Sequence, residues 1–254
     1  MIELDGVGKI FSTRRGSSHT ALRDIALDIP AGRFVSILGP SGCGKSTLLY
    51  MIGGFESCSS GQIRVQGKPV TGPGPDRGPV FQEYALFPWK TVLGNVAYGM
   101  QEQGVPRRQA EERAREWLDK VKLGPYASFY PRELSGGMRQ RAAIARTLAY
   151  EPGILLMDEP FGALDAHTRV NLQTELLTLW EQLRNTVVFV THGVDEAVFL
   201  SDTVVVMTGS PGRIKEIVDI DLPRPRVRAE LLRNPVYQDT IIRLEQSLMA
   251  EVHP

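Results

Sequence analysis

The sequence has few cysteines, no excess of charge of either sign and no long apolar run. Its only cysteines, Cys43 and Cys58, lack metal-ligand spacing, so we expect reduced thiols in a cytosolic protein. Lysine plus arginine and aspartate plus glutamate number 29 each. This balance argues against broad electrostatic attachment to nucleic acid or anionic lipid. We therefore expect no nucleic-acid partner.

Membrane-targeting features are also lacking. No segment approaches the roughly 20 apolar residues that cross a bilayer, and residues 1–11, MIELDGVGKIF, lack the basic and then apolar pattern of a signal peptide. We expect the chain to start and stay in the cytosol. If it works at a membrane, another chain must span the bilayer.

The length of 254 residues suits one large α/β domain or two small ones. Short strands are expected within residues 2–37, a helix from about Lys45 and a strand over 61–66. A helical pattern covers about 85–149. Within it, one face of a helix is expected to hold Ala110, Ala114, Trp117, Leu118 and Val121.

After residue 152 the sequence alternates between apolar strands and helices, expected at 153–157, 169–183, 186–190, 194–200 and 203–207. Such alternation predicts a parallel sheet that helices cover on both faces. The helical stretch 85–149 is then a subdomain inserted into this α/β core. We expect residues 226–254 to form a helical tail, which either makes a regulatory contact or packs on the core.

A glycine-rich stretch lies between an expected strand and an expected helix. It consists of Gly39, Pro40, Ser41, Gly42, Cys43, Gly44, Lys45, Ser46 and Thr47, and it contains the pattern G-x-x-x-x-G-K-[ST]. Its backbone N–H groups can surround a β-phosphate, Lys45 can reach the β- and γ-phosphates, and the Ser46 hydroxyl can ligate Mg²⁺. A glycine turn also arises by chance, but the flanking strand and helix favour a site for ATP and Mg²⁺.

Two carboxylates, Asp158 and Glu159, follow the apolar strand 153–157. A carboxylate at the end of a buried strand beside a phosphate loop can hold Mg²⁺ through water, and we expect Asp158 to do so. Because side chains alternate along a strand, we expect Glu159 to point elsewhere and to act as the general base on the attacking water. Without the phosphate loop, such an acidic pair would more often be a solvated turn.

A second glycine turn opens the basic helical segment LSGGMRQRAAIAR at residues 134–146. A helix begins with backbone N–H groups that have no partner within the helix, and glycines let a phosphate approach them. An exposed helix end stabilises an anion by only about 0.3–1 kcal/mol, which is too little to hold ATP alone. The turn becomes effective when it closes over a γ-phosphate that another site already holds.

The ordered set of motifs resembles the ATP-binding subunits of ATP-binding cassette (ABC) transporters. The motifs GPSGCGKST, LSGGMRQR, ILLMDEP, GALD and VTHGVDEA have the order and spacing of that family over essentially residues 1–220. The resemblance implies an α/β fold: a P-loop NTPase (RecA-like) core with an N-terminal antiparallel β subdomain and an inserted helical subdomain. This ABC ATPase domain would cover residues 1–225, and the second glycine turn would complete the ATP site of a partner subunit.

The resemblance also implies roles for three separate residues. Phe11 would stack on the adenine, where family members often have tyrosine; its alternative role is that of a core residue. Gln82 would contact Mg²⁺ and the attacking water, although such residues are usually turn formers. His192 would reach the γ-phosphate, although a lone histidine at a strand end is more often a surface residue.

Four residues would act across a dimer interface. Ser135, Gly136 and Gly137 would contact the γ-phosphate of the opposite subunit, and Asp165 in GALD would cross the interface. Met138 stands where many relatives have glutamine. The contacts expected from this turn are therefore those of its backbone.

Residues 72–100, GPGPDRGPVFQEYALFPWKTVLGNVAYGM, look like the corresponding segment of the nitrate, sulfonate and taurine importers, and the DLPRPR segment is also similar. Residues 84–100 would form the docking groove for a permease, with an apolar cluster of Tyr84, Leu86, Phe87, Pro88 and Trp89. The alternative for this cluster is a packed hinge between the core and the helical subdomain. Both interpretations can hold together.

The resemblance thus implies an ATP-hydrolysing subunit on the cytoplasmic face of the inner membrane. It would pair with a second copy of itself, bind integral membrane permease subunits and depend indirectly on an extracytoplasmic solute-binding protein. The imported solute would be a small anion such as sulfonate, taurine or nitrate. One alternative is an ABC regulator that uses ATP as a dimerisation switch without a permease. A P-loop kinase or switch GTPase is disfavoured by LSGGM and by the lack of an N/TKxD motif.

Overall fold

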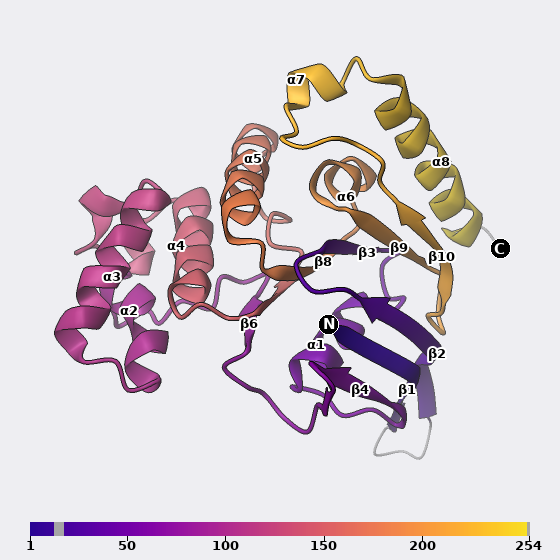
Figure 1. Cartoon of the computed structure of the whole chain (residues 1–254), viewed down its shortest axis with the longest axis horizontal. Coiled ribbons are helices and arrows are strands. Elements are labelled where there is room, and N and C mark those ends of the chain that lie inside the picture. The colour runs from indigo at the N-terminus through magenta and orange to yellow at the C-terminus, as the bar shows by residue number, and fades with distance from the viewer. Residues whose placement is uncertain (13–17, 253–254) are drawn as a thin grey trace. The chain divides into compact units, whose positions relative to one another are not determined.

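The computed structural model describes residues 1–12 and 18–252. The chain forms two compact units, one of Met1–Gly74 with Trp180–Pro254 and one of Pro75–Leu179. Figure 1 labels their helices and strands. In the part of the chain that is described, no helix has both the length and the apolar character needed to cross a membrane.

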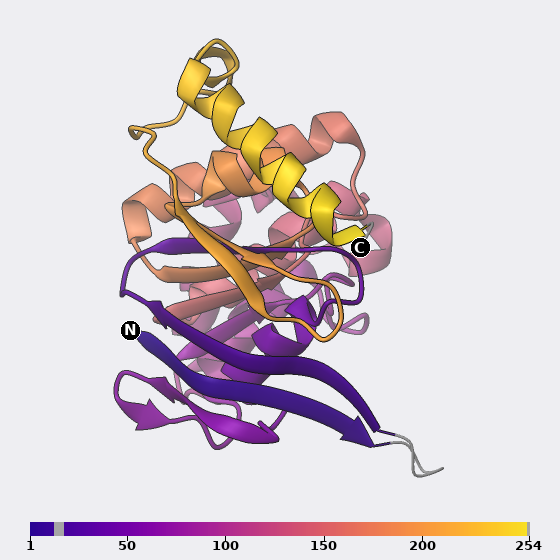
Figure 2. The same cartoon turned by 90° about the vertical axis from the view of Figure 1, so that its right-hand side faces the viewer.

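The first unit contains an antiparallel sheet in the order β2-β1-β4-β5. Its strands are β1 (Ile2–Ser12), β2 (Ser18–Ile29), β4 (Ser60–Val65) and β5 (Lys68–Pro69). Ile2 is the Cα partner of both Ile29 and Val65, and all three side chains are buried. Figure 2 shows the long strands β1 and β2 side by side. The predicted N-terminal antiparallel β subdomain is confirmed.

The same unit contains the strands β3 (Phe34–Leu38), β8 (Thr186–Thr191), β9 (Thr203–Met207) and β10 (Ile214–Asp219), with the helices α1 (Lys45–Gly53) and α6 (Val194–Leu200). Both β8 and β9 pair with β3 in parallel. The bounds of α6 and β9 agree with the prediction. β10 was not predicted: it pairs antiparallel with β9, and its exposed residues alternate with partly or fully buried ones. The sheet is therefore not wholly parallel, because this edge strand lacks the uniform apolar character of the others.

The C-terminal segment belongs to the first unit and contains α7 (Arg228–Leu231) and α8 (Pro235–Val252). α8 contacts α6 and β9, and its residues Tyr237 and Leu244 are buried. α8 therefore packs on the α/β part of its own unit.

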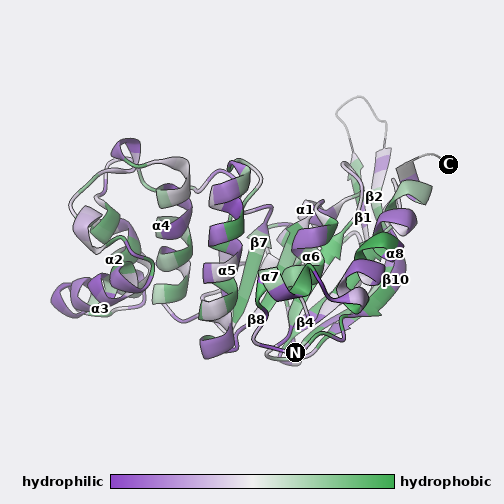
Figure 3. Cartoon of the chain, turned by 90° about the horizontal axis from the view of Figure 1, so that it is seen from above, coloured by the Kyte–Doolittle hydropathy of each residue, from purple (hydrophilic) through white to green (hydrophobic). Residues whose placement is uncertain are grey.

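The second unit contains two parallel strands, β6 (Arg77–Val80) and β7 (Ile154–Asp158). Its helices are α2 (Val92–Glu102), α3 (Arg107–Lys120), α4 (Gly136–Ala149) and the start of α5 (Ala166–Leu183). It also contains the short 3-10 helices Gly124–Tyr126 and Pro131–Glu133. The buried face predicted in this region is confirmed, because each of its five residues is at most 6% exposed. The outward side of α3 is hydrophilic (Figure 3). β6 was missed because its sequence, RGPV, contains glycine and proline, which are rare within strands other than edge strands.

Candidate functional site

The glycine-rich stretch 39–47 (the phosphate loop) runs from the end of β3 into the first turn of α1, as predicted. Gly44 caps α1 with a left-handed backbone, φ 97°. A Cβ atom at this position would lie 2.7 Å from Leu22 Cδ2 and 3.1 Å from the Ala21 carbonyl oxygen. Only glycine satisfies both constraints, so β2 packs directly against the backbone that begins the helix.

A turn after β9 supports the loop from another side. A Cβ atom on Gly212 would lie 2.0 Å from the Cys43 carbonyl oxygen. Gly212 also donates its N–H to Ala21 O at 2.9 Å and accepts the Arg23 N–H at 3.0 Å. The Cys43 side chain is buried, and burial raises the pKa of its thiol. Backbone packing therefore determines the shape of the loop, and Cys43 is a neutral part of the core.

Lys45, the first residue of α1, has only 6% of its surface exposed. Its Nζ donates to the carbonyl oxygens of Gly39 at 2.9 Å and Pro40 at 3.0 Å. No ion pair to a carboxylate neutralises this ammonium within residues 1–12 and 18–252. The loop thus holds a positive charge next to the backbone N–H groups at the start of α1, an arrangement suited to phosphate.

His192 follows β8 at the same edge of the sheet as this loop. The register of the parallel strands pairs Leu38 with Thr191, so the residues after both strands emerge together. His192 is exposed and lies between the end of β8 and the start of α6. His192 and the phosphate loop are about 150 residues apart in the sequence. The parallel pairing of β3 and β8 brings them to one edge of the sheet.

Phe11 lies near the end of β1 with 38% of its surface exposed. Its alternative role as a core residue is therefore excluded. The ammonium of Lys9 lies 4.9 Å from the centroid of its ring. The ring remains accessible for the stacking role that the resemblance implies.

In the second unit, β6 and β7 bring Gln82 and the acidic pair to a common edge. Val80 pairs with Met157 in the parallel register, so the residues that follow each strand emerge on the same side. A Cβ atom on Gly162 would lie 3.7 Å from Gln82 Nε2 and 3.8 Å from Glu159 Oε2. These two side chains therefore converge over Gly162, while Asp158 is buried at 4% exposure.

The prediction that strand alternation directs the Glu159 side chain is wrong. β7 ends at Asp158, and Glu159 has a left-handed backbone with φ 42°. Strand alternation does not extend to such a residue. The left-handed turn, closed by a hydrogen bond from Gly162 N to Glu159 O at 3.0 Å, sets the direction of this carboxylate.

Ser135 and Asp165 each cap a helix of the second unit. Ser135 is exposed and accepts the Met138 N–H at 3.3 Å to cap α4. Asp165 accepts the Thr168 N–H at 3.0 Å at the start of α5, and this hydrogen bond lowers the pKa of its carboxyl. A Cβ atom on Gly137 would lie 2.6 Å from Thr168 Cγ2, so the beginnings of the two helices are in contact.

Two residues to which the sequence assigned no role hold the segment after Gln82. Arg146 of α4 donates to the carbonyl oxygens of Ala85 at 2.5 Å and Tyr84 at 3.3 Å. The buried Asn95 accepts the Phe87 N–H at 2.7 Å and donates to Phe87 O at 3.1 Å. Arg146 ends the segment LSGGMRQRAAIAR and Asn95 lies within residues 72–100, but the sequence gave neither residue a role. Their partners are known only from the folded structure.

The apolar cluster 84–89 is packed at one end and exposed at the other. The ring centroid of Phe87 lies 4.7 Å from that of Tyr98 and 5.6 Å from that of Trp89. Trp89 itself is 71% exposed. The segment therefore combines a packed base with an accessible aromatic surface, and aromatic side chains of this kind are enriched at protein interfaces.

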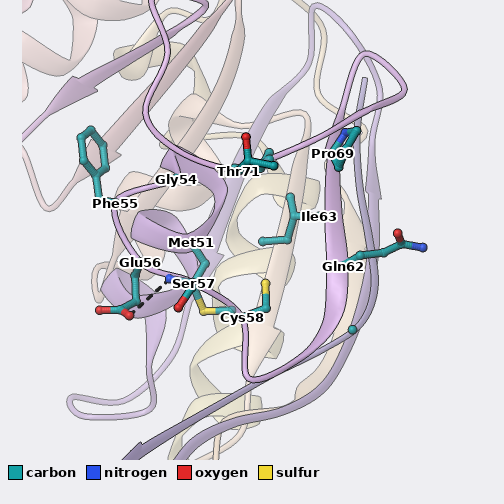
Figure 4. A pocket seen from close by; sticks show the side chains of 12 residues that line it. Met51, Gly54, Phe55, Glu56, Ser57, Cys58, Gln62, Ile63, Pro69 and Thr71 are labelled. Atoms are coloured by element: carbon teal, nitrogen blue, oxygen red, sulfur yellow. Dashed lines mark hydrogen bonds between the residues drawn. The ribbon is translucent and has the colours of Figure 1, made fainter.

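A separate pocket of about 620 Å³ lies between the C-terminal end of α1 and the strands β4 and β5 (Figure 4). Met51 and Ile63 in its lining are buried, and Glu56 pairs with Lys9 at 2.6 Å. Cys58 is a free thiol whose pKa is raised by burial. None of the phosphate-loop residues line this pocket.

Comparisons with known proteins agree with this arrangement of motifs. The family model for ABC transporters matches residues 22–162. An uncharacterized ABC transporter ATP-binding protein of Methanocaldococcus jannaschii is 52% identical over 91% of this chain and 86% of its own length. The nitrate import ATP-binding protein of Synechococcus elongatus is 48% identical over 94% of this chain and 37% of its own length. The bicarbonate transport ATP-binding protein of Synechocystis sp. is 48% identical over 93% of this chain and 36% of its own length.

Two solved structures share the fold. A dimeric bacterial ABC transporter cassette has a TM-score of 0.78 and 33% identity, covering 88% of this chain and 100% of that one. A dimeric cassette in a post-hydrolysis state bound to ADP and phosphate has a TM-score of 0.77 and 32% identity, with the same coverage. The predicted fold class is confirmed. This chain belongs to the ABC transporter family and is an ATP-binding, ATP-hydrolysing cassette of that family.

Proposed function

We propose that this chain powers the import of a small anion, of the nitrate, bicarbonate or sulfonate type, through a separate membrane permease. The observation that carries the proposal is the similarity over more than nine tenths of the chain to nitrate and bicarbonate transport ATP-binding proteins. The segment 72–100 adds support from the sequence. The chain would act at the cytoplasmic face of the membrane, and an extracytoplasmic protein would deliver the solute.

ATP would be held by the glycine-rich loop, with Phe11 on the adenine and Lys45 on the β- and γ-phosphates. Mg²⁺ fits the oxygen donors that the chain offers, namely the Ser46 hydroxyl, the Gln82 side-chain amide and the buried Asp158 carboxylate. The ion would supply charge neutralisation on the phosphates.

Glu159 would act as the general base that accepts a proton from the attacking water. Its convergence with Gln82 over Gly162 supports a shared task in orienting that water. His192 would contact the γ-phosphate from the edge of the sheet that also carries the phosphate loop. In this arrangement most of the catalysis comes from positioning and electrostatic stabilisation.

A second copy of the chain would complete each site. Ser135, Gly136 and Gly137 lie at the exposed start of α4, where backbone N–H groups favour an anion. In the proposed dimer they contact the γ-phosphate held by the other copy, and Asp165 lies at the interface between the copies. The dimeric cassettes of similar fold support this assembly. ATP binding would then close the dimer, and hydrolysis would reopen it.

The permease would dock on the aromatic surface around Trp89. We expect Trp89→Ala to reduce the amount of permease that co-purifies from membranes, because the side chain that is 71% exposed is lost from the docking surface. The matched control is Phe55→Ala, which removes an aromatic side chain that is 45% exposed in the first unit. ATP hydrolysis by the isolated variants checks that both are folded.

Mass spectrometry of the co-purified proteins tests the proposal itself. A multi-span permease in the wild-type sample, depleted by Trp89→Ala and retained by Phe55→Ala, supports import. Recovery of partners that are all non-membrane proteins would instead favour the alternative, an ABC regulator that uses ATP as a dimerisation switch.

A further inference from the structure

The C-terminal segment binds both ends of α6, the helix that begins two residues after His192. At the end of α6, Arg226 Nη1 donates to the carbonyl oxygens of Val198 at 3.0 Å, Phe199 at 3.0 Å and Ser201 at 2.8 Å. A cation at this position complements the partial negative charge of a helix C-terminus. Burial, together with the nearby Arg224, lowers the pKa of Arg226 to about 10, so its guanidinium still carries its charge at neutral pH.

At the start of α6, both carboxylate oxygens of Asp195 are held by the same segment. Arg228 Nη1 lies 2.5 Å from Oδ2, and the Tyr237 hydroxyl donates to Oδ1 at 2.5 Å. Tyr237 is only 1% exposed. Burial and the hydrogen bond to Asp195 raise the pKa of its phenol, which keeps the hydroxyl protonated as a donor. The Arg228 guanidinium also lies 4.2 Å from the ring centroid of Phe199.

Hydrogen bonds also connect the first turn of α6 to the residues on both sides of His192. The Thr191 hydroxyl is hydrogen-bonded to the Glu196 carboxylate. The same hydroxyl oxygen accepts the Gly193 N–H at 2.9 Å. His192 thus lies between Thr191 and Gly193, which are linked by hydrogen bonds to each other and to the first turn of α6. A displacement of the first turn of this helix would move His192 with it.

α6 has only seven residues, too few for a helix to be stable in isolation. Its position must therefore come from tertiary contacts. Its apolar residues pack inside the unit and hold its body. The exposed side of the first turn is held by Asp195 and its two partners from the C-terminal segment.

We propose that Arg228 and Tyr237 are positioning residues for His192, acting through Asp195, so that the C-terminal segment controls the rate of ATP hydrolysis. The proposal rests on the proposed role of His192 at the γ-phosphate. A partner that binds or displaces α8 would thereby change turnover. A change at Arg228 or Tyr237 would leave nucleotide affinity unchanged, because the phosphate loop is held by β2 and the turn at Gly212, and neither residue lies in those segments.

The test compares the steady-state kinetics of full-length variants. Tyr237→Phe removes one hydroxyl and should lower kcat by about tenfold, with KM and the Kd for ATP unchanged, since small misplacements of a catalytic group cost rate. Arg228→Gln should act in the same direction, and Arg228→Lys should recover most of the rate because it keeps the charge. The control is Arg243→Gln, which lies on α8 like Tyr237. This substitution breaks an ion pair to Glu216 and removes no contact to α6 that the variants above test.

The imidazole NMR resonances of His192 give a readout that general structural damage would not reproduce. His192→Ala assigns these resonances. Tyr237→Phe should shift them, whereas Arg243→Gln should not. Wild-type kcat in both Tyr237→Phe and Arg228→Gln, with kcat lost in His192→Ala, would overturn the inference and leave the proposed function standing.

Two other outcomes would have different meanings. Wild-type turnover in His192→Ala would overturn the proposed role of the histidine itself. A loss of kcat in Tyr237→Phe together with a matching loss of ATP affinity and an unchanged His192 resonance would show general damage, and would also overturn the inference.

Discussion

At the scale of single residues, the site depends on side chains whose direction is set by local backbone geometry or by hydrogen bonds. Glu159 has a left-handed backbone after β7, and its carboxylate and the Gln82 side chain both lie within 4 Å of a Cβ atom built on Gly162. Lys45 is directed into the phosphate loop by the carbonyl oxygens of that loop. Substitutions that preserve shape and remove a single chemical property are therefore the most informative.

Glu159→Gln should slow ATP hydrolysis by about 10²–10⁴-fold, the usual contribution of a general base. ATP binding should persist, because the amide keeps the shape of the side chain. Phosphate release and nucleotide binding measure the two effects, and size-exclusion chromatography with ATP should show an accumulated dimer. The control is Glu151→Gln, which also has a left-handed backbone, φ 54°, and precedes the same strand. Wild-type turnover in Glu159→Gln would remove this residue from the mechanism.

At the scale of elements, polar contacts join α8 to β10. Glu216 of β10 is paired with Arg243 at 2.7 Å and hydrogen-bonded to the Ser247 hydroxyl. Lys215, next to it, donates to Ser247 O at 2.8 Å and lies 2.8 Å from Glu251 Oε1. These contacts hold the C-terminal half of α8 against β10, whereas Tyr237, which holds Asp195, lies in the first turn of the same helix.

The stability that Glu216 contributes should depend on pH. Hydrogen bonds from Ser247 and then Arg243, together with the charge of Arg243, lower the pKa of this carboxyl from its ordinary value. A lowered pKa in the folded state means that the stabilisation is fully present above the unfolded pKa and is lost as the pH falls through the folded one. Glu216→Gln should therefore reduce the free energy of unfolding at pH 7, by no more than about 1 kcal/mol for so exposed a pair.

Urea unfolding at pH 7 and at pH 3 measures this dependence. The difference between wild type and Glu216→Gln should shrink at the lower pH. Glu245→Gln, at an exposed position of α8, should show little difference at either pH. An equal loss at both values would mean that the amide disturbs packing rather than an ionised contact.

At the scale of the whole molecule, the proposed hydrolytic site needs two copies of the chain. The phosphate loop of one copy would meet the glycine turn after Ser135 of the other. The exposed position of Ser135 at the start of α4 supports a site that is shared between two copies. A single copy would then bind ATP without hydrolysing it efficiently.

Mixing two inactive variants tests directly whether each site is shared between two copies. Lys45→Ala removes the ammonium of the phosphate loop, and Ser135→Arg blocks the glycine turn. Each variant alone should be inactive, but a mixed dimer retains one site built from the intact loop of one copy and the intact turn of the other. Phosphate release should therefore reappear on mixing and depend on protein concentration. A mixture that stays inactive, although light scattering shows mixed dimers, would rule out shared sites.

The sequence by itself determined the features that local patterns encode. Glycine spacing between a strand and a helix located the phosphate loop, and apolar periodicity gave the buried face of α3 and the bounds of α6 and β9. The ordered motifs were sufficient for the family, because each consists of neighbouring residues. These features depend on chain segments short enough to be identified without knowing what they pack against.

Only the tertiary structure decided the features whose partners are distant. β6 and β10 are strands because a neighbouring strand pairs with them, despite glycine and proline in one and mixed polarity in the other. Tyr237 holds Asp195 across 42 residues of sequence. No local pattern encodes such a contact, because its geometry exists only after β8, α6 and α8 have packed into one unit.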